Sequence, residues 1–165
     1  MEKDISLQLK PIKLLGLDVD GVLTDGGIYI TDSGEEIKRF DVKDGLGLQL
    51  LMRSGIEVAI ISASRSPAIR HRAERLGIRH VLLGVEDKLT ALKTLCQQLE
   101  LQLENVAYVG DDATDTPVLL TVGCPLTVAD AIQPNKNCAV YITQRPGGHG
   151  AVRELCDLFL TTLAV

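Results

Sequence analysis

Two aspartates one residue apart, Asp18 and Asp20, come directly after an apolar run, Leu14–Leu17. The run indicates a buried strand, and strand side chains two residues apart project to the same face. Both carboxylates are therefore expected at the carboxyl end of the strand, where open α/β sheets bind their ligands. Such a pair repels unless a cation or a shared proton relieves it, and Mg²⁺ takes oxygen ligands. By itself the pair fits either a metal-assisted reaction or a simple turn cap.

Three further polar residues follow later predicted strands. Ser62 comes after an aliphatic run and can donate a hydrogen bond to an oxyanion. Lys88 opens a helix, where the helix dipole disfavours a cation, so its ammonium is expected to balance an anion. Asp111 would complete the oxygen shell of a metal ion. Each residue alone has an ordinary structural explanation, but together, on successive strand ends, they predict a site for a phosphate ester.

Strands and helices must alternate along the chain to bring these residues together. Apolar runs predict strands over residues 12–17, 56–61, 80–83, 105–109, 126–128 and 139–142. Helical patterns cover residues 46–54, 67–76, 86–99 and 115–122, and a last helix starts near residue 150. This alternation with short loops predicts an α/β fold with a doubly wound, mostly parallel sheet.

The segment of about residues 26–41 departs from this alternation. Two short runs flank the turn-forming triplet Asp32-Ser33-Gly34, which predicts a β-hairpin inserted after the first strand. Residues 1–11 are expected to precede the fold as a loose leader. No internal repeat or linker divides the chain, so residues 1–165 are expected to form one domain.

The composition argues against several classes of protein. The net charge of −5 disfavours nucleic acid as a partner, because phosphate-backbone binding needs clustered lysine and arginine. No apolar run approaches the roughly 20 residues of a membrane helix, so no membrane partner is expected. Residues 1–10 lack an apolar signal core, and the expected location is the cytoplasm. The cysteines are widely spaced, which favours reduced thiols over a zinc site.

The stretch from Asp18 to Gly26, Asp-Val-Asp-Gly-Val-Leu-Thr-Asp-Gly, resembles the first motif of haloacid dehalogenase-type phosphatases. Ser62, Lys88 and Asp111 match the later motifs of that family in order, and the likeness extends over about residues 14–160. It is greatest for a small capless subgroup, which implies a HAD-like Rossmannoid fold without a cap domain. A signalling receiver domain carries similar groups, but its phosphorylated aspartate lies on a later strand, where this chain has Ser62.

The resemblance implies a Mg²⁺-dependent phosphoric monoester hydrolase and a role for each motif residue. Asp18 is expected to attack phosphorus, forming an aspartyl-phosphate, and to bind the metal. Asp20 is expected to act as general acid and base, with its backbone carbonyl on the metal. Asp111 is expected to bind the metal, and Ser62 and Lys88 are expected to bind phosphate.

The subgroup also implies the substrate, a phosphorylated sugar acid of lipopolysaccharide biosynthesis. The expected reaction converts 3-deoxy-D-manno-octulosonate 8-phosphate to the free sugar acid and phosphate. A phosphatase for a nine-carbon sugar acid phosphate, a broad-specificity phosphatase and a non-catalytic assembly domain of the same fold are the alternatives. The residues expected to contact the substrate are Asp20, Asp41, Val42, Lys43, Asp44, Gly45, Gln49, Ser64, Arg72 and Lys88. Gln49 and Ser64 stand where the subgroup carries arginines, whose forks grip carboxylates, so the choice of sugar acid stays open.

Other segments acquire expected roles from the same resemblance. The hairpin is expected to drive a homotetramer in which neighbouring subunits help to close each active site. The glycine-rich loop of residues 144–150 is expected near an active site, either its own or a neighbour's. Asp112 and Asp115 are expected to order the loop after Asp111 and to hold the Lys88 ammonium.

Overall fold

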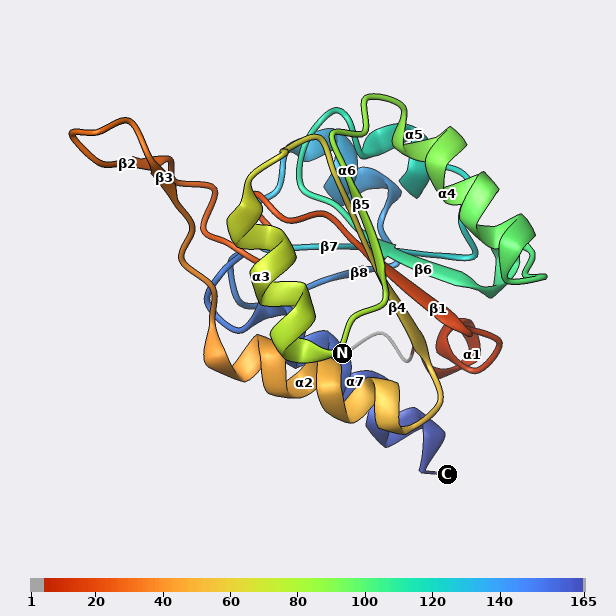
Figure 1. Ribbon diagram of the computed structural model, residues 1–165. Coiled ribbons are helices and arrows are strands. Elements are labelled where there is room, and N and C mark those ends of the chain that lie inside the picture. The colour runs from red at the N-terminus through yellow and green to blue at the C-terminus, as the bar shows by residue number, and fades with distance from the viewer. Residues whose placement is uncertain (1–4, 165) are drawn as a thin grey trace.

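The computed structural model describes residues 5–164 and centres on a six-stranded sheet. The strand order is β5-β4-β1-β6-β7-β8, and every neighbouring pair is parallel (Figure 1). The strands are β1 (Leu14–Leu17), β4 (Glu57–Ser62), β5 (His80–Leu83), β6 (Val106–Val109), β7 (Cys124–Thr127) and β8 (Tyr141–Ile142). The chain runs outward from β1 to β5 and then crosses back to β6, so the topological switch point lies between β1 and β6. The predicted doubly wound parallel sheet is confirmed.

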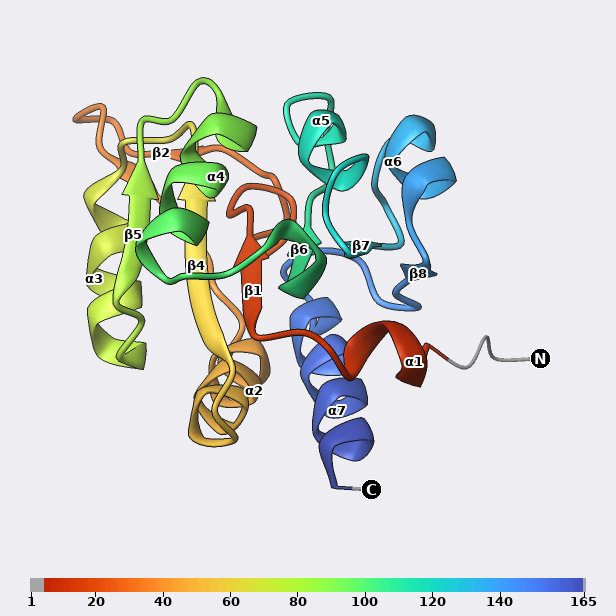
Figure 2. The same cartoon turned by 90° about the vertical axis from the view of Figure 1, so that its right-hand side faces the viewer.

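Two layers of helices cover the sheet, one on each face (Figures 1 and 2). One layer contains α1 (Ser6–Leu9), α2 (Val42–Arg53), α3 (Pro67–Leu76) and α7 (Ala151–Leu163). The other contains α4 (Lys88–Gln98), α5 (Thr116–Leu119) and α6 (Gln133–Cys138). A single turn of 3₁₀ helix, Leu103–Asn105, leads into β6.

Burial on both faces explains why the central strands read as continuous apolar runs. Along β4, Val58 and Ile60 pack with the layer of α2, α3 and α7, whereas Ala59 and Ile61 pack with the layer of α4 and α5. A strand buried on both sides has no polar face, so its sequence shows no alternation.

Two short helices were not expected from the sequence. In α1, Ile5 and Leu9 are buried against the core, so the expected loose leader is ordered from residue 5 onward; residues 1–4 lie outside the described part of the chain. Helix α6 covers only six residues, which is too short to show a helical repeat in the sequence. The helix expected over residues 115–122 is shorter, because turns after Leu119 bring the chain into β7.

The predicted hairpin is formed by β2 (Tyr29–Ile30) and β3 (Glu36–Ile37), which pair antiparallel. It projects away from the body of the molecule (Figure 1). Gly34 closes its turn with a φ of 86°, a left-handed conformation that favours glycine. Between β1 and α2 the structure holds only this hairpin and its connecting loops, with no cap domain.

None of the helices within residues 5–164 has the length and apolar character needed to span a membrane. The four cysteines, Cys96, Cys124, Cys138 and Cys156, are free thiols.

Candidate active site

Three carboxylates converge at the switch point of the sheet. Strands β1 and β6 pair in a register that sets Leu17 opposite Val109, so the residues that follow each strand meet at one edge. One carboxylate oxygen each from Asp18, Asp111 and Asp115 lies within 4.8 Å of the others. The structure therefore brings Asp18 and Asp111 together, as the two strand ends predicted.

The Lys88 ammonium lies among these carboxylates. Its Nζ is 2.9 Å from Asp18 Oδ2 and 2.8 Å from Asp115 Oδ1, and its side chain is 2% exposed. Burial alone lowers the pKa of Lys88, but the charges of Asp18 and Asp115 outweigh it and raise that pKa. The ammonium stays charged at neutral pH and offsets the negative charge of Asp18.

Asp115 has both carboxylate oxygens occupied by partners in the protein. Oδ1 accepts hydrogen bonds from Lys88 Nζ and from the Tyr108 hydroxyl, each at 2.8 Å. Oδ2 accepts from the backbone N–H groups of Asp111 and Asp112, at 3.1 and 3.2 Å. These contacts order the loop after β6 and hold Lys88, in agreement with the sequence-based expectation for Asp115.

The environment of Asp18 and Asp111 fits a divalent cation. Asp111 Oδ1 is buried without a hydrogen-bond partner. Burial, together with the charge of Asp115, raises the pKa of Asp111 to about 7 and that of Asp18 to about 8, the latter against the opposing effect of Lys88. Carboxylates with such raised pKa values are stabilised by a cation, and Mg²⁺ accepts their oxygen ligands. Asp115 is less suited as a ligand, because its oxygens already accept four hydrogen bonds.

A tight turn after β1 makes this convergence possible. Gly21 has a φ of 85°, and an added Cβ there would overlap the Asp111 carboxylate. Glycine is needed at this position because it permits both the backbone conformation and the close approach.

The second aspartate of the pair contacts the hairpin. Lys38, which follows β3, places its Nζ 2.7 Å from Asp20 Oδ1 and 2.7 Å from Glu36 Oε1, with its side chain 7% exposed. The role of Lys38 could not be predicted from the sequence, because a lysine next to a short hairpin strand indicates a solvated side chain. No local signal distinguishes it from its charged neighbours.

A cavity of about 250 Å³ opens above these groups. It is lined by Asp18, Asp20, Gly26, Ser62, Ala63, Ser64, Lys88, Asp111, Asp112 and Thr114. The Ser62 hydroxyl is buried and accepts from the backbone N–H of Ser64 at 3.2 Å, which leaves its own proton for an anion in the cavity. All five predicted catalytic, metal-binding and phosphate-binding residues thus line one cavity.

Most of the predicted substrate residues lie outside this cavity. Asp41 caps α2 by accepting from the backbone N–H of Lys43 at 2.7 Å. The Arg72 guanidinium donates to the Asp41 carbonyl at 3.1 Å and lies 5.8 Å from the centre of the Phe40 ring. Within residues 5–164, Asp20, Ser64 and Lys88 are the predicted substrate contacts that line the cavity, whereas those that do not are Asp41, Val42, Lys43, Asp44, Gly45, Gln49 and Arg72.

The Asp44 carboxylate is part of the fold rather than of the cavity. The residue is 1% exposed, and its Oδ1 accepts from the backbone N–H of Arg153 at 2.8 Å, in the first turn of α7. Asp44 therefore joins α2 to α7, and its side chain is not available to a substrate in this chain.

The glycine-rich loop of residues 144–150 packs against the turn that follows β1 in the same chain. The backbone N–H of Gly148 donates to the carbonyl of Val22 at 3.0 Å, and the Gly148 carbonyl accepts from Arg39 at 2.8 Å. An added Cβ on Gly147 would overlap the carbonyl oxygen of Gly21. This contact is possible only because the loop lacks side chains at the point of approach.

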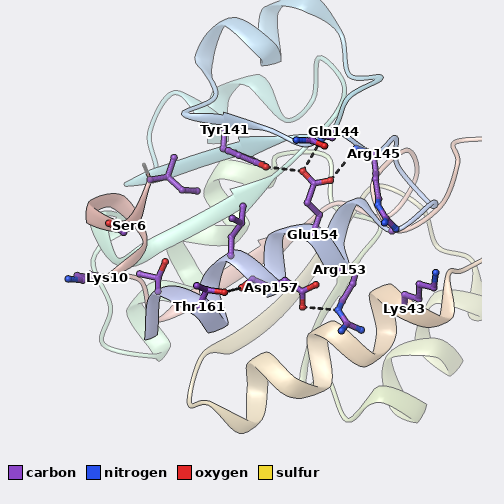
Figure 3. A pocket seen from close by; sticks show the side chains of 14 residues that line it. Ser6, Lys10, Lys43, Tyr141, Gln144, Arg145, Arg153, Glu154, Asp157 and Thr161 are labelled. Atoms are coloured by element: carbon purple, nitrogen blue, oxygen red, sulfur yellow. Dashed lines mark hydrogen bonds and ion pairs between the residues drawn. The ribbon is translucent and has the colours of Figure 1, made fainter. Parts of the chain in front are cut away.

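A second and larger cavity, of about 1050 Å³, lies between α1, α7 and the segment after β8 (Figure 3). Glu154 on its wall accepts from the Tyr141 hydroxyl and the Gln144 backbone N–H, and Asp157 pairs with Arg153 at 2.8 Å. None of the converging carboxylates lines it, so the smaller cavity is the candidate active site.

Comparison with known proteins defines the class. A family model of haloacid dehalogenase-like hydrolases matches residues 81–155. The 3-deoxy-D-manno-octulosonate 8-phosphate phosphatase of Escherichia coli K12 is 47% identical over 157 residues, which are 95% of this chain and 84% of that protein. The fold, the converging aspartates and this similarity together define a haloacid dehalogenase-like hydrolase.

Solved structures identify a family within this class of hydrolases. The crystal structure of the Moraxella catarrhalis 3-deoxy-D-manno-octulosonate 8-phosphate phosphatase, in complex with magnesium, phosphate and KDO, matches with a TM-score of 0.95 and 42% identity over 98% of this chain and 93% of that chain. The cobalt-bound enzyme of Haemophilus influenzae matches with a TM-score of 0.91 and 41% identity over 95% of this chain and 92% of that chain. The chain belongs to the family of the 3-deoxy-D-manno-octulosonate 8-phosphate phosphatases.

Proposed function

We propose that the protein hydrolyses 3-deoxy-D-manno-octulosonate 8-phosphate to the free sugar acid and phosphate. The observation that carries this proposal is the convergence of Asp18, Asp111 and Lys88 at one strand edge, with Lys88 Nζ 2.9 Å from Asp18. The identity of 47% to an enzyme of that name supports the choice of substrate.

The carboxylates of Asp18 and Asp111, with the backbone carbonyl of Asp20, would hold Mg²⁺. The bound ion supplies positive charge that stabilises the phosphoryl oxygens in the transition state. In this proposal Lys88 and the Ser62 hydroxyl bind other oxygens of the same group. Phosphoryl transfer depends mainly on such positioning and charge neutralisation.

The covalent steps are assigned to the two aspartates. Asp18 attacks phosphorus; the new carboxylate–phosphorus bond forms as the phosphorus–oxygen bond to the sugar breaks. Protonated Asp20 gives its proton to the departing sugar oxygen. Asp20 then takes a proton from water, whose oxygen attacks the aspartyl-phosphate and releases phosphate and Asp18. Lys38 contacts Oδ1 of Asp20, so Oδ2 is the oxygen assigned to proton transfer.

A broad-specificity phosphatase is the second candidate. Ser64 lines the cavity where the subgroup carries an arginine, so no guanidinium from this position grips the sugar carboxylate. The missing guanidinium does not distinguish the eight-carbon sugar acid phosphate from a nine-carbon one, because recognition of either depends on that carboxylate.

We further propose that the chain forms one domain and assembles as a cytoplasmic homotetramer through the hairpin. The hairpin exposes apolar side chains, with Ile28 77% and Ile30 66% exposed. In such an assembly a neighbouring subunit would supply substrate contacts that lie outside the cavity of each chain.

Release of phosphate from a matched panel of esters tests this function. The panel contains 3-deoxy-D-manno-octulosonate 8-phosphate, a nine-carbon sugar acid 9-phosphate and p-nitrophenyl phosphate, each with Mg²⁺ and with EDTA. The expected result is the highest kcat/KM on the eight-carbon ester, loss of activity in EDTA and recovery with Mg²⁺. Comparable kcat/KM values on all three esters would favour the broad-specificity candidate. Hydrolysis of none of them would refute the proposal.

A further inference from the structure

A buried tyrosine is hydrogen-bonded to Asp115, the carboxylate that also holds Lys88. Tyr108 is in β6, its side chain is fully buried, and its hydroxyl donates to Asp115 Oδ1 at 2.8 Å. The same oxygen accepts from Lys88 Nζ, which also pairs with Asp18. A continuous chain of contacts therefore runs from the Tyr108 hydroxyl through Asp115 and Lys88 to the Asp18 carboxylate.

The fold provides a specific place for this ring. Strands β1 and β6 pair with Gly16 opposite Tyr108, and an added Cβ on Gly16 would lie 2.8 Å from Tyr108 Cδ2. The ring fills the space that a glycine leaves in the neighbouring strand. A buried hydroxyl needs a hydrogen-bond partner, and Asp115 supplies it here.

Tyr108 affects the position of Lys88, because both residues donate a hydrogen bond to Asp115 Oδ1. With the hydroxyl present, Asp115 Oδ1 accepts from two side-chain donors, which restrain the carboxylate and with it the ammonium of Lys88. Without it, Lys88 is the only side-chain donor to that oxygen. When the Tyr108 hydroxyl is removed, the Asp115 carboxylate binds the Lys88 ammonium more strongly. The ammonium is then drawn away from Asp18 and from a phosphoryl oxygen of the substrate.

We propose that Tyr108 is a positioning residue for the phosphatase reaction, acting through Asp115 to hold Lys88 in place against the transferring phosphoryl group. This inference rests on the proposed function of the site. Tyr108 itself touches neither substrate nor metal; its effect passes through one hydrogen bond to Asp115 Oδ1.

Tyr108→Phe tests the role, because it keeps the ring and removes only the hydroxyl. Tyr141→Phe is the matched control: the Tyr141 hydroxyl donates to Glu154 at 2.9 Å, next to the larger cavity and away from the carboxylates. We expect kcat/KM of Tyr108→Phe to fall by about tenfold to a hundredfold, the range of one hydrogen bond to a charged group. The inhibition constant of inorganic phosphate should rise with it, whereas Tyr141→Phe should change neither.

A double-mutant cycle separates positioning from general loss of structure. If Tyr108 acts through Lys88, Tyr108→Phe should have little further effect in a Lys88→Met background, measured on p-nitrophenyl phosphate. Additive losses in that background would overturn the inference. Wild-type values for both kcat/KM and phosphate inhibition in Tyr108→Phe would overturn it as well, even if the protein is a phosphatase.

The two proposals fail in distinguishable ways. If the wild type hydrolyses no ester of the panel, the proposed function fails. Phosphate affinity measured by calorimetry in wild type, Tyr108→Phe and Tyr141→Phe still tests the positioning role, since it requires binding only. Equal affinity in all three proteins would refute that role. If part of the Tyr108→Phe protein does not fold, the double-mutant cycle with Lys88→Met is measured on the folded fraction alone. That measurement still decides whether Tyr108 acts through Lys88.

Discussion

Asp18 combines burial, a neighbouring negative charge and a paired ammonium within one side chain. Burial and Asp115 raise its pKa to about 8, and Lys88 works in the opposite direction. In the proposed mechanism Asp18 must be ionised to attack phosphorus, so the ammonium beside it would assist that step. The same pattern at Asp111 explains why the two residues fit a shared cation.

Replacing Asp18 with asparagine removes the carboxylate that is proposed to attack phosphorus. Asp18→Asn should lower kcat by about a thousandfold or more, because the amide cannot form the aspartyl-phosphate. The measurement is phosphate release under saturating substrate, with circular dichroism to show that the variant is folded. A folded variant with a normal rate would remove Asp18 from the mechanism.

Helices α2 and α7 are joined through a buried carboxylate, which links the stability of this contact to pH. Burial raises the pKa of Asp44 to about 6 from an ordinary value of 3.8, although the backbone N–H of Arg153 opposes the rise. The folded state therefore binds the Asp44 proton more tightly than the unfolded state does. Below about pH 4, protonated Asp44 makes its full contribution to the free energy of unfolding. This contribution is lost as the pH rises through about 6.

Asp44→Asn isolates that contribution, because it keeps an acceptor for Arg153 and cannot ionise. At about 1.4 kcal/mol for each pKa unit, ionised Asp44 lowers the free energy of unfolding at neutral pH by about 3 kcal/mol. The difference in unfolding free energy between Asp44→Asn and wild type should therefore grow by that order between pH 4 and pH 7. Urea unfolding across this range measures it. If the free energies of unfolding of the two proteins changed in parallel with pH, burial would not raise the pKa of Asp44.

The loop of residues 144–150 is a second element whose packing affects the site. Gly147→Ala would place a methyl group against the Gly21 carbonyl, next to the turn that carries Asp20. Overpacking of this kind destabilises by about 1–3 kcal/mol, and the displaced turn should lower kcat by about tenfold. Thermal unfolding and phosphate release measure the two effects.

Gly77→Ala is the matched control for that substitution. Gly77 ends α3 with a φ of 79° and open space around it, so alanine there adds backbone strain without displacing the site. It should lower stability and leave kcat unchanged. If Gly147→Ala also kept the wild-type kcat, the loop would not position the catalytic turn.

The hairpin exposes large apolar side chains that no other part of the chain within residues 5–164 covers. Ile28, Ile30 and Ile37 are 77%, 66% and 53% exposed, although they are large and apolar. Exposed apolar side chains of this kind are typical of a surface that binds another protein, which supports the proposed assembly. Lys38, which follows β3, contacts Asp20, so this element connects the proposed subunit interface to the candidate active site.

The double variant Ile28→Asp/Ile30→Asp should dissociate the proposed tetramer. Charge on the hairpin opposes its burial between subunits, so light scattering coupled to size exclusion should show a smaller species. The KM for the sugar ester should rise about tenfold, because contacts from the neighbour are lost. Leu120→Asp, at a 70% exposed position outside the hairpin, is the control and should leave assembly unchanged. A wild type that runs as an active monomer would contradict the prediction.

The class of fold and the polar residues at the strand ends follow from local patterns in the sequence. Aliphatic runs mark strands buried on both faces, and a polar residue directly after such a run can lie only at the carboxyl edge. This is why Asp18, Ser62 and Asp111 were predicted together. The turn triplet at residues 32–34 likewise fixed the hairpin, since turn chemistry is local.

Which side chains meet depends on how elements far apart in the sequence pack together. Asp44 and Arg153 are 109 residues apart, and their contact depends on how α2 and α7 dock. Lys38 reaches Asp20 because the second strand of the hairpin leads the chain back toward the end of β1. Tyr108 reaches Asp115 because Gly16 leaves room for its ring. Local patterns repeat every two or 3.6 residues and set the face on which a side chain lies. They carry no information about the partner that the assembled layers bring to that face.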